Sequence, residues 1–228
     1  MDDSTSPPRG GGTGPYDVSD APEGNRLDLG SLQIPVVDGV DIRVQANAEG
    51  VVQQVVLVHQ DSLLQLSVLA APRSAGIWDE VREEILSSMR SDGARVEESS
   101  GDYGPELRAR VRIPNGQADL RFIGVDGPRW MVQAMYQGRA AVDPSAAGPL
   151  EECLLGLVVD RGWEAKPVRE ALPLRLPREM AEQAKAQAEA QAGAQADGGR
   201  PGGAQEPGVN GGPVGPVGPP TNTPRRPR

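Results

Sequence analysis

The chain has 228 residues, a formal net charge of −9, one cysteine and one histidine. The acidic balance argues against general binding to nucleic acid or to an anionic membrane, because the mean field of the protein repels polyanions. A single cysteine excludes an intrachain disulfide, which suits a reducing compartment. The longest apolar runs are far shorter than the roughly 20 residues of a membrane helix, and the N-terminus lacks the basic and apolar regions of a signal peptide. We therefore expect a soluble, cytoplasmic protein with no membrane segment.

Apolar residues are concentrated in the middle of the chain. Residues 1–26 and 198–228 are rich in Gly, Pro and short polar residues, and neither segment can bury enough apolar surface to offset the entropy cost of ordering it. Residues 179–197 are an Ala/Gln-rich helix former without an apolar stripe, so a helix there need not pack on anything. We expect one domain over residues 27–178, flanked by a disordered head and a disordered tail.

Alternating apolar residues predict four short strands in a meander at the start of the domain. Asp38-Gly39 is typical of a hairpin turn between residues 32–37 and 40–45. Pro35 would make the first of these runs an edge strand or exclude it from a sheet. A turn at residues 47–50, a strand over 51–59 and an alternating run after Asp61-Ser62 follow.

A helical period follows the meander. The apolar residues that carry it are Ile77, Trp78, Val81, Ile85 and Met89. Asp79 and Glu80 fall in the first turn, where the helix dipole favours acidic side chains, and Asp92-Gly93 is a typical C-terminal stop. The spacing predicts an amphipathic helix between these signals.

The clearest sheet signal is the alternation over residues 106–113, which turns at Asn115-Gly116 and continues to Phe122. With that turn centre, the expected pairs are Val111 with Leu120, Ala109 with Phe122, Arg112 with Asp119 and Arg110 with Arg121. A second turn at Asp126-Gly127 begins a strand over 129–137. Its register stays open between Met131 and Trp130 as the partner of Phe122.

A second amphipathic helix is predicted by the spacing of Leu150, Cys153, Leu154, Leu157 and Val158. Pro149 suits its first turn, and a start at Asp143-Pro144 is the alternative. Gly162 is the expected cap, with Trp163 folding back on the helix, and a short strand near 167–172 completes the domain. The predicted fold class is α+β: a mostly antiparallel meander sheet packed against two amphipathic helices.

Residues of catalytic type are scarce in the folded middle. His59 lies in a strand pattern, and Cys153 lies on the apolar stripe of a helix, where thiols usually act as small hydrophobes. The carboxylates Glu97, Glu98 and Asp102 flank Ser and Gly residues typical of a solvated loop. The sequence therefore predicts no catalytic, cofactor-binding or metal-binding residue, and no cofactor.

Two features stand out as candidate interaction or anion sites. Arg108, Arg110 and Arg112 alternate along one strand, with Arg121 across the hairpin, and guanidinium groups bind carboxylate or phosphate in a bidentate manner. The alternative is a solvated sheet face that Glu106 and Asp119 partly neutralise.

The second feature is the pair Arg129-Trp130, with Tyr103 at the start of the neighbouring strand pair. Tryptophan and arginine are typical anchors of protein interfaces. The alternative is that the tryptophan fills the core.

Several of these segments resemble an actinobacterial family catalogued as domain of unknown function 3710. The resemblance is carried by Tyr103-Gly104-Pro105-Glu106-Leu107, the block Arg121–Trp130 and the segment Leu150–Gly162, and by Gly14–Asp17, Leu27–Val37 and Trp78–Ile85. It covers roughly residues 14–178. It implies one domain and a bacterial cytoplasmic setting, and it transfers no activity, cofactor or catalytic residue.

Two functional hypotheses follow from the sequence. The first is a non-enzymatic protein-interaction module with a protein partner, favoured by the scarcity of catalytic residues and by long flexible ends. The alternative is a small-anion or nucleotide-binding protein that uses the arginine-rich sheet face. Nucleic-acid binding is the weakest interpretation because the chain is acidic.

Overall fold

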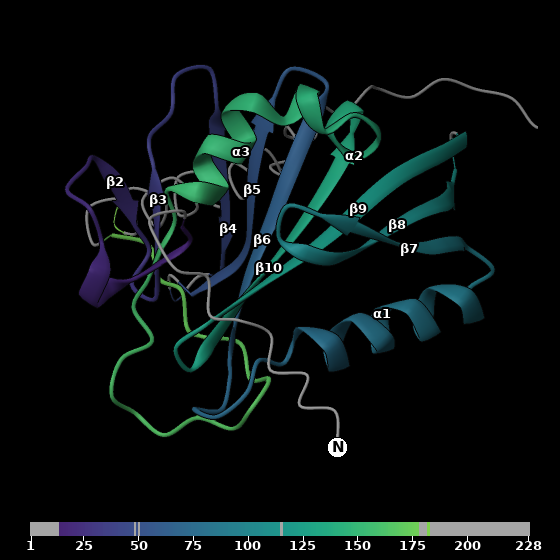
Figure 1. Cartoon of the computed structure of the whole chain (residues 1–228). Helices are drawn as coiled ribbons and strands as arrows, with labels where there is room; N and C mark the ends of the chain where they lie inside the picture. The colour runs from purple at the N-terminus through teal and green to yellow at the C-terminus, as the bar shows by residue number, and fades with distance from the viewer. Residues whose placement is uncertain (1–13, 48, 50, 115, 178–181, 183–228) are drawn as a thin grey trace, which may run out of the picture. The chain divides into compact units, whose positions relative to one another are not determined.

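Figure 1 shows the computed structural model, which describes residues 14–47, 49, 51–114, 116–177 and 182. The described part of the chain holds two sheets and is mostly antiparallel, as the predicted α+β class requires. The larger sheet has the strand order β4-β5-β6-β10-β9-β8-β7, and the smaller one has the order β1-β11-β3-β2. The expected Ala/Gln-rich extension and C-terminal tail lie outside the described residues, except for Glu182, which is helical.

The elements follow in chain order. They are β1 (Tyr16–Asp17), the 3-10 helix η1 (Val18–Asp20), β2 (Arg26–Asp28), β3 (Leu32–Pro35), β4 (Asp41–Ala46), β5 (Val52–His59), β6 (Ser62–Ala70), α1 (Trp78–Ser91), β7 (Arg95–Gly101), β8 (Gly104–Ile113), β9 (Gly116–Gly127), β10 (Trp130–Gly138), α2 (Arg139–Val142), the 3-10 helix η2 (Pro144–Ala147), α3 (Gly148–Leu155) and β11 (Val158–Val159).

The predicted meander forms from β4, β5 and β6, but the hairpin at Asp38-Gly39 is wrong. The turn itself is present, since the amide of Val40 donates to the carbonyl of Val37 over 3.2 Å. However, β3 pairs with β2 and β11 in the smaller sheet, so it is an inner strand and not the predicted edge strand. Pro35 is tolerated because β11 pairs only with Leu32 and Gln33 and stops short of it.

The hairpin of β8 and β9 forms with a register two residues away from the predicted one. Ile113 pairs with Gly116, so the turn lies one residue earlier than Asn115-Gly116. The faces of the strands are unchanged, because a shift of two keeps every side chain on its side of the sheet. The partners change: Arg108 now faces Arg121, and Arg110 faces Asp119.

The strand β7 was not predicted. Its residues Glu97 and Glu98 were interpreted as a solvated loop, but they pair with Arg108 and Leu107 of β8. Polar residues suit this position because β7 is the last strand of the larger sheet, and charged side chains protect an exposed edge against pairing with another chain.

The turn from β9 to β10 also lies later than predicted. Trp130 pairs with Gly127 and Met135 pairs with Phe122, so both registers considered for Phe122 are wrong. The turn consists of Pro128 and Arg129, and Arg129 has a φ of 65°. Proline followed by a residue with positive φ is the arrangement of a type II turn.

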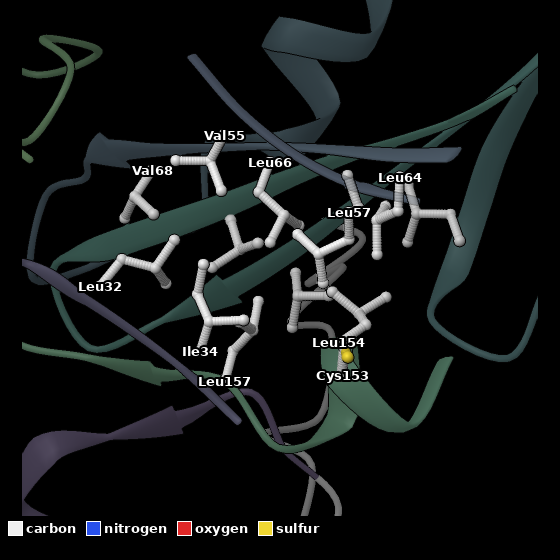
Figure 2. Close-up of a cluster of buried hydrophobic side chains, with 14 of the residues drawn as sticks. Leu32, Ile34, Val55, Leu57, Leu64, Leu66, Val68, Cys153, Leu154 and Leu157 are labelled. Carbon is white, nitrogen blue, oxygen red and sulfur yellow. The ribbon is translucent and has the colours of Figure 1, made fainter. Parts of the chain in front are cut away.

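One face of the larger sheet packs against β3, α3 and the chain that follows α3. Figure 2 shows the centre of this core, where leucine, isoleucine and valine side chains from both sheets meet those of α3. Leu32 and Ile34 of β3 are fully buried, as are Leu57 and Leu64 of the larger sheet. Each such side chain contributes about 2 kcal/mol by leaving water.

Helix α1 packs against the opposite face of the larger sheet, and residues of β9 contact its start. Phe122, Gly124 and Asp126 alternate along β9 and therefore point to the same side. The carboxylate of Asp126 accepts the amides of Ile77 and Trp78 over 2.8 and 3.3 Å, so a distant strand caps the helix. The indole N–H of Trp78 donates to the carbonyl of Pro105 over 2.7 Å.

The predicted second helix is shorter than its apolar spacing suggested. Helix α3 ends at Leu155 and is capped at Gly156, not at Gly162. Val158 instead begins β11, which completes the smaller sheet. Each of the two predicted helix starts coincides with the start of a helical element. Asp143 caps the 3-10 helix η2 by accepting the amide of Ser145, and Pro149 lies in the first turn of α3.

The segments at the two ends of the domain differ from expectation. Residues 14–26, assigned to the disordered head, include β1 and η1, and Tyr16 pairs with Val158 of β11. Residues 1–13 lie outside the described part. The strand expected near 167–172 is reduced to single bridges, such as Leu69 with Ala171, beside the end of β6.

We predict that Gly124→Ala destabilises the protein by about 1–3 kcal/mol through overpacking. A Cβ at this position would lie 2.1 Å from the Trp78 ring, which rests on the bare backbone. Urea unfolding of the single variant and of Gly124→Ala combined with Trp78→Phe measures the effect. The cost should fall in the double background, because the smaller ring leaves room for the methyl group. A neutral Gly124→Ala variant would contradict this packing.

Candidate functional site

The arginine stripe of β8 and β9 surrounds a buried glutamate. Glu106 is 2% exposed, and it accepts hydrogen bonds from both Arg108 and Arg121. Oε1 of Glu106 binds Nε and Nη2 of Arg108 over 3.1 and 3.0 Å. Oε2 binds Nε and Nη2 of Arg121 over 2.8 and 2.7 Å. The two arginines that face each other across the hairpin are therefore bridged by one carboxylate, and Arg121 is 3% exposed.

The pKa of Glu106 reflects two opposing effects. Burial raises the pKa, but the hydrogen bonds from Arg121 and Arg108, together with the charge of Arg121, lower it below its ordinary value of 4.5. Ser99 adds a further hydrogen bond from its hydroxyl over 3.2 Å. Glu106 is thus ionised at neutral pH, and one carboxylate shares two guanidinium charges. One positive charge of this group remains uncompensated.

The other arginines of the stripe lie nearer the surface. Arg110 donates from Nε to Asp119 over 2.6 Å, and its side chain is 54% exposed. Arg95 of β7 pairs in register with Arg110. Together with Arg108, these residues line a hollow of about 320 Å³ that α2 borders through Ala141 and Val142. The predicted convergence of Arg108 and Arg110 on one face therefore exists, and β7 adds a third arginine.

Tyr103 belongs to a different polar cluster, which joins α3 to the sheet. The hydroxyls of Tyr103 and Tyr136 donate to the two carboxylate oxygens of Glu151 over 2.6 and 2.8 Å. The guanidinium carbon of Arg121 lies 5.7 Å from the centre of the Tyr136 ring, which connects this cluster to Glu106. Burial and the charge of Glu151 raise the pKa of Tyr136 far above its usual value, so this phenol stays protonated.

The pair Arg129-Trp130 does not form an exposed anchor. Trp130 is 1% exposed and its indole N–H donates to Asp17 over 2.9 Å, so it belongs to the core and fixes β1. Arg129 is half-buried in the turn before β10, where its carbonyl accepts the amide of Ala71. These two residues lie at the opposite end of β10 from Tyr136, which pairs with Arg121. The structure thus separates the two predicted candidate sites.

Trp163, in contrast, was expected to fold back on the second helix and is 97% exposed. The expectation failed because the helix ends at Leu155 and the chain then enters β11. Nothing in the sequence marks Trp163 as a surface residue, since tryptophan is a common core residue. Glu106 carried a weak signal, being an acid two residues before Arg108 on the same side of a strand.

The two side chains of catalytic type are engaged in the fold. Burial raises the pKa of Cys153 to about 12, so its thiol is protonated, and the sulfur lies 3.9 Å from the carbonyl of Pro35. Nδ1 of His59 lies 2.8 Å from the carbonyl of Gly39. Within the described ranges, the side chains of His, Cys, Asp and Glu form no group of three that could hold a metal ion.

None of the helices in the described part of the chain is long and apolar enough to cross a membrane.

We predict that Glu106→Gln lowers the unfolding free energy by about 3 kcal/mol at neutral pH, because the amide leaves the buried Arg121 charge unbalanced. Since the folded pKa of Glu106 lies below 4.5, its contribution is present above that pH and is lost as the pH falls through the folded pKa. The stability difference between the two proteins should therefore shrink on acidification. Denaturant unfolding across the pH range measures both effects.

The matched control for this prediction is Glu98→Gln on the neighbouring strand. Glu98 lies 3.5 Å from Arg82 and is 46% exposed, so its loss should cost no more than about 1 kcal/mol. Equal costs for the two variants, or a difference that does not change with pH, would contradict the described role of Glu106.

Comparison with known proteins gives one family and several distant structural likenesses, two of which follow. A crystal structure from Bacteroides thetaiotaomicron VPI-5482 is 12% identical with a TM-score of 0.40, and the match covers 63% of this chain and 51% of that one. The chain thus spans about half the length of that protein. The solution structure of PsbP (CyanoP) from Synechocystis sp. PCC 6803 is 13% identical with a TM-score of 0.34, covering 60% of this chain and 92% of that one.

At these TM-scores neither likeness carries a functional argument. No curated protein matches the sequence. The model of a family described as protein of unknown function (DUF3710) matches residues 14–183, which include both sheets and every residue of the arginine-rich face. The chain belongs to this family.

Proposed function

We propose that this protein is a non-enzymatic protein-interaction module and that Trp163 is its principal contact residue. The observation that carries the proposal is the exposure of this side chain, of which 97% is in contact with solvent. A tryptophan left in water forgoes the free energy that burying its large apolar surface provides. Tryptophan is also among the residues that contribute most to binding at protein interfaces.

The loop that carries Trp163 is held in place by its neighbours. The amide of Asp160 donates to the carbonyl of Ser31 over 3.1 Å, and the carboxylate of Asp160 accepts the amide of Gly162 over 2.9 Å. Nη1 of Arg161 donates to the carbonyl of Glu164 on the far side of the tryptophan. A contact residue on a fixed loop loses less conformational entropy on binding than one on a mobile loop.

The charges beside Trp163 indicate the chemistry of the partner. The side chain of Glu164 is 85% exposed, whereas that of Lys166 is 17% exposed and lies within 3.8 Å of Glu164 and Glu170. The cation is thus covered and the carboxylates face solvent. A partner with an apolar pocket bordered by basic side chains complements this surface, and charge complementarity of this kind favours specific association.

The state of the catalytic-type side chains supports a binding role. The Cys153 thiol is fully buried and protonated, and the ring of His59 contacts a backbone carbonyl on an outer hairpin of the sheet. Neither side chain lines the hollow beside Arg95 and Arg108.

We predict that Trp163→Ala weakens binding to the protein partner about 30-fold or more, equivalent to about 2 kcal/mol. Stability should change by no more than about 0.5 kcal/mol, because the side chain has no buried contacts to lose. The test is capture of partners from native lysate by the wild type, Trp163→Ala and Val36→Ala. Val36 is 57% exposed and serves as the matched control for loss of an exposed apolar side chain.

A direct measurement then follows the tryptophan itself. In protein labelled with 5-fluorotryptophan, Trp163 should give a solvent-exposed ¹⁹F resonance, since Trp78 and Trp130 are 4% and 1% exposed. Addition of the captured partner should shift that resonance and leave the other two in place. The proposal fails if Trp163→Ala captures the same proteins as the wild type, or if the Trp163 resonance does not change in the complex.

A further inference from the structure

The hollow beside the arginine-rich face has the composition of a small-ligand site. It measures about 320 Å³ and lies between β7, β8 and β9 on one side and α2 on the other. Its charged lining consists of Arg95, Arg108 and Arg110 with Glu97 and Asp119. The volume falls at the lower end of the range of known ligand pockets, roughly 300–1,000 Å³. The surface lies on a different part of the chain from Trp163.

The charges around this hollow leave it positive although the whole chain is acidic. Asp119 balances Arg110, and Glu106 is shared between Arg108 and Arg121. Glu97 is the second carboxylate of the lining, so the three arginines there exceed the two carboxylates by one charge. Arg108 donates from Nε and Nη2 to the carboxylate of Glu106, so its Nη1 donors remain for a ligand. A guanidinium fixed in this way is preorganised to bind an anion.

Arg95 supplies the second cation. It faces Arg110 directly across the strand pair, and like charges in that position repel each other. In the described part of the chain, the Arg95 side chain makes no ion pair and no hydrogen bond, and it is exposed. An anion bound by Arg95 and Arg108 would offset part of the repulsion between Arg95 and Arg110, and it would accept from Arg95 donors that have no partner among the described residues.

The wall opposite the arginines is apolar. Ala141 and Val142 of α2 line the hollow, and Val142 is 55% exposed. A second hollow of about 440 Å³ shares Val142 and Asp119 with the first and reaches Ile113, which is 42% exposed. Exposed apolar side chains beside a charged hollow suit a ligand that has an apolar part next to its charged end.

We propose that this hollow binds a small organic anion, a phosphate monoester or a carboxylate joined to a short apolar group. The anionic oxygens bind Arg95 and Arg108, and the apolar group contacts Val142. This site is independent of the partner-binding surface at Trp163, so either can fail without the other.

The test uses phenyl phosphate and benzoate as probes, with benzyl alcohol as the neutral control of similar shape. Titrations of the full chain are followed through the arginine Nε–Hε resonances and the backbone amides of β7, β8 and α2. We expect saturable shifts at Arg95 and Arg108 with at least one anion and none with benzyl alcohol. The phosphate and carboxylate arms identify which anion the site prefers.

Arg95→Gln should weaken binding of the preferred probe about tenfold or more, equivalent to about 1.4 kcal/mol. It should leave the unfolding midpoint unchanged, because the side chain is exposed. Arg43→Gln is the control, since Arg43 is a 64% exposed arginine on β4, away from the hollow, and its guanidinium pairs with Asp41. The proposal is overturned if neither anion gives a saturable shift, if benzyl alcohol binds as well, or if Arg95→Gln binds as tightly as the wild type.

Discussion

The alternation of side chains along β9 is the constraint on which both faces of the larger sheet depend. On one side Phe122, Gly124 and Asp126 accommodate α1, the glycine by leaving room for an indole ring and the aspartate by capping the helix. On the other side Asp119 and Arg121 contribute to the charged face, and Ile123 lies in the main core. A slip of one residue would exchange these two sets, so the register of β9 determines helix docking and the charged face together.

Glu106 converts a set of arginines that would repel one another into an ordered surface. Its two oxygens take one arginine each, and it is almost fully buried. Glu106 and Asp119 neutralise part of the stripe, as the sequence indicated, but Glu106 does so from a buried position. One guanidinium, that of Arg121, becomes structural, and the other, that of Arg108, keeps donors toward the hollow. A single buried carboxylate thus gives one of two facing arginines a structural role and leaves the other at the lining of the hollow.

Local sequence signals predicted the elements well and their partners less well. The helix at 78–91 and the strands of the larger sheet other than β7 follow from residue periodicity, which depends on neighbours in the chain. The predicted register of β8 and β9 was wrong because the turn lies one residue earlier than expected. Strand β3 does not form the expected hairpin because Leu32 and Ile34 are buried between the two sheets. Such outcomes depend on distant contacts. The sequence allowed Arg108 and Arg110 to be assigned to one surface. It did not indicate that Arg95 lies beside them, that Trp163 is exposed, or that Trp130 is separated from Arg121.

The parallel pairing of β1 with β11 has a consequence for the order in which the protein can be completed during synthesis. Tyr16 and Asp17 pair with Val158 and Val159, and β3 pairs with the same two residues. The small sheet cannot close on the ribosome until residue 159 has left the exit tunnel, while β4, β5 and β6 can already pair with one another. Tyr16 and Asp17 therefore cannot pair until Val158 and Val159 have been synthesised. The nascent chain exposes Leu32 and Ile34 during that interval. Translation speed over the second half of the message thus sets how long this apolar surface stays uncovered.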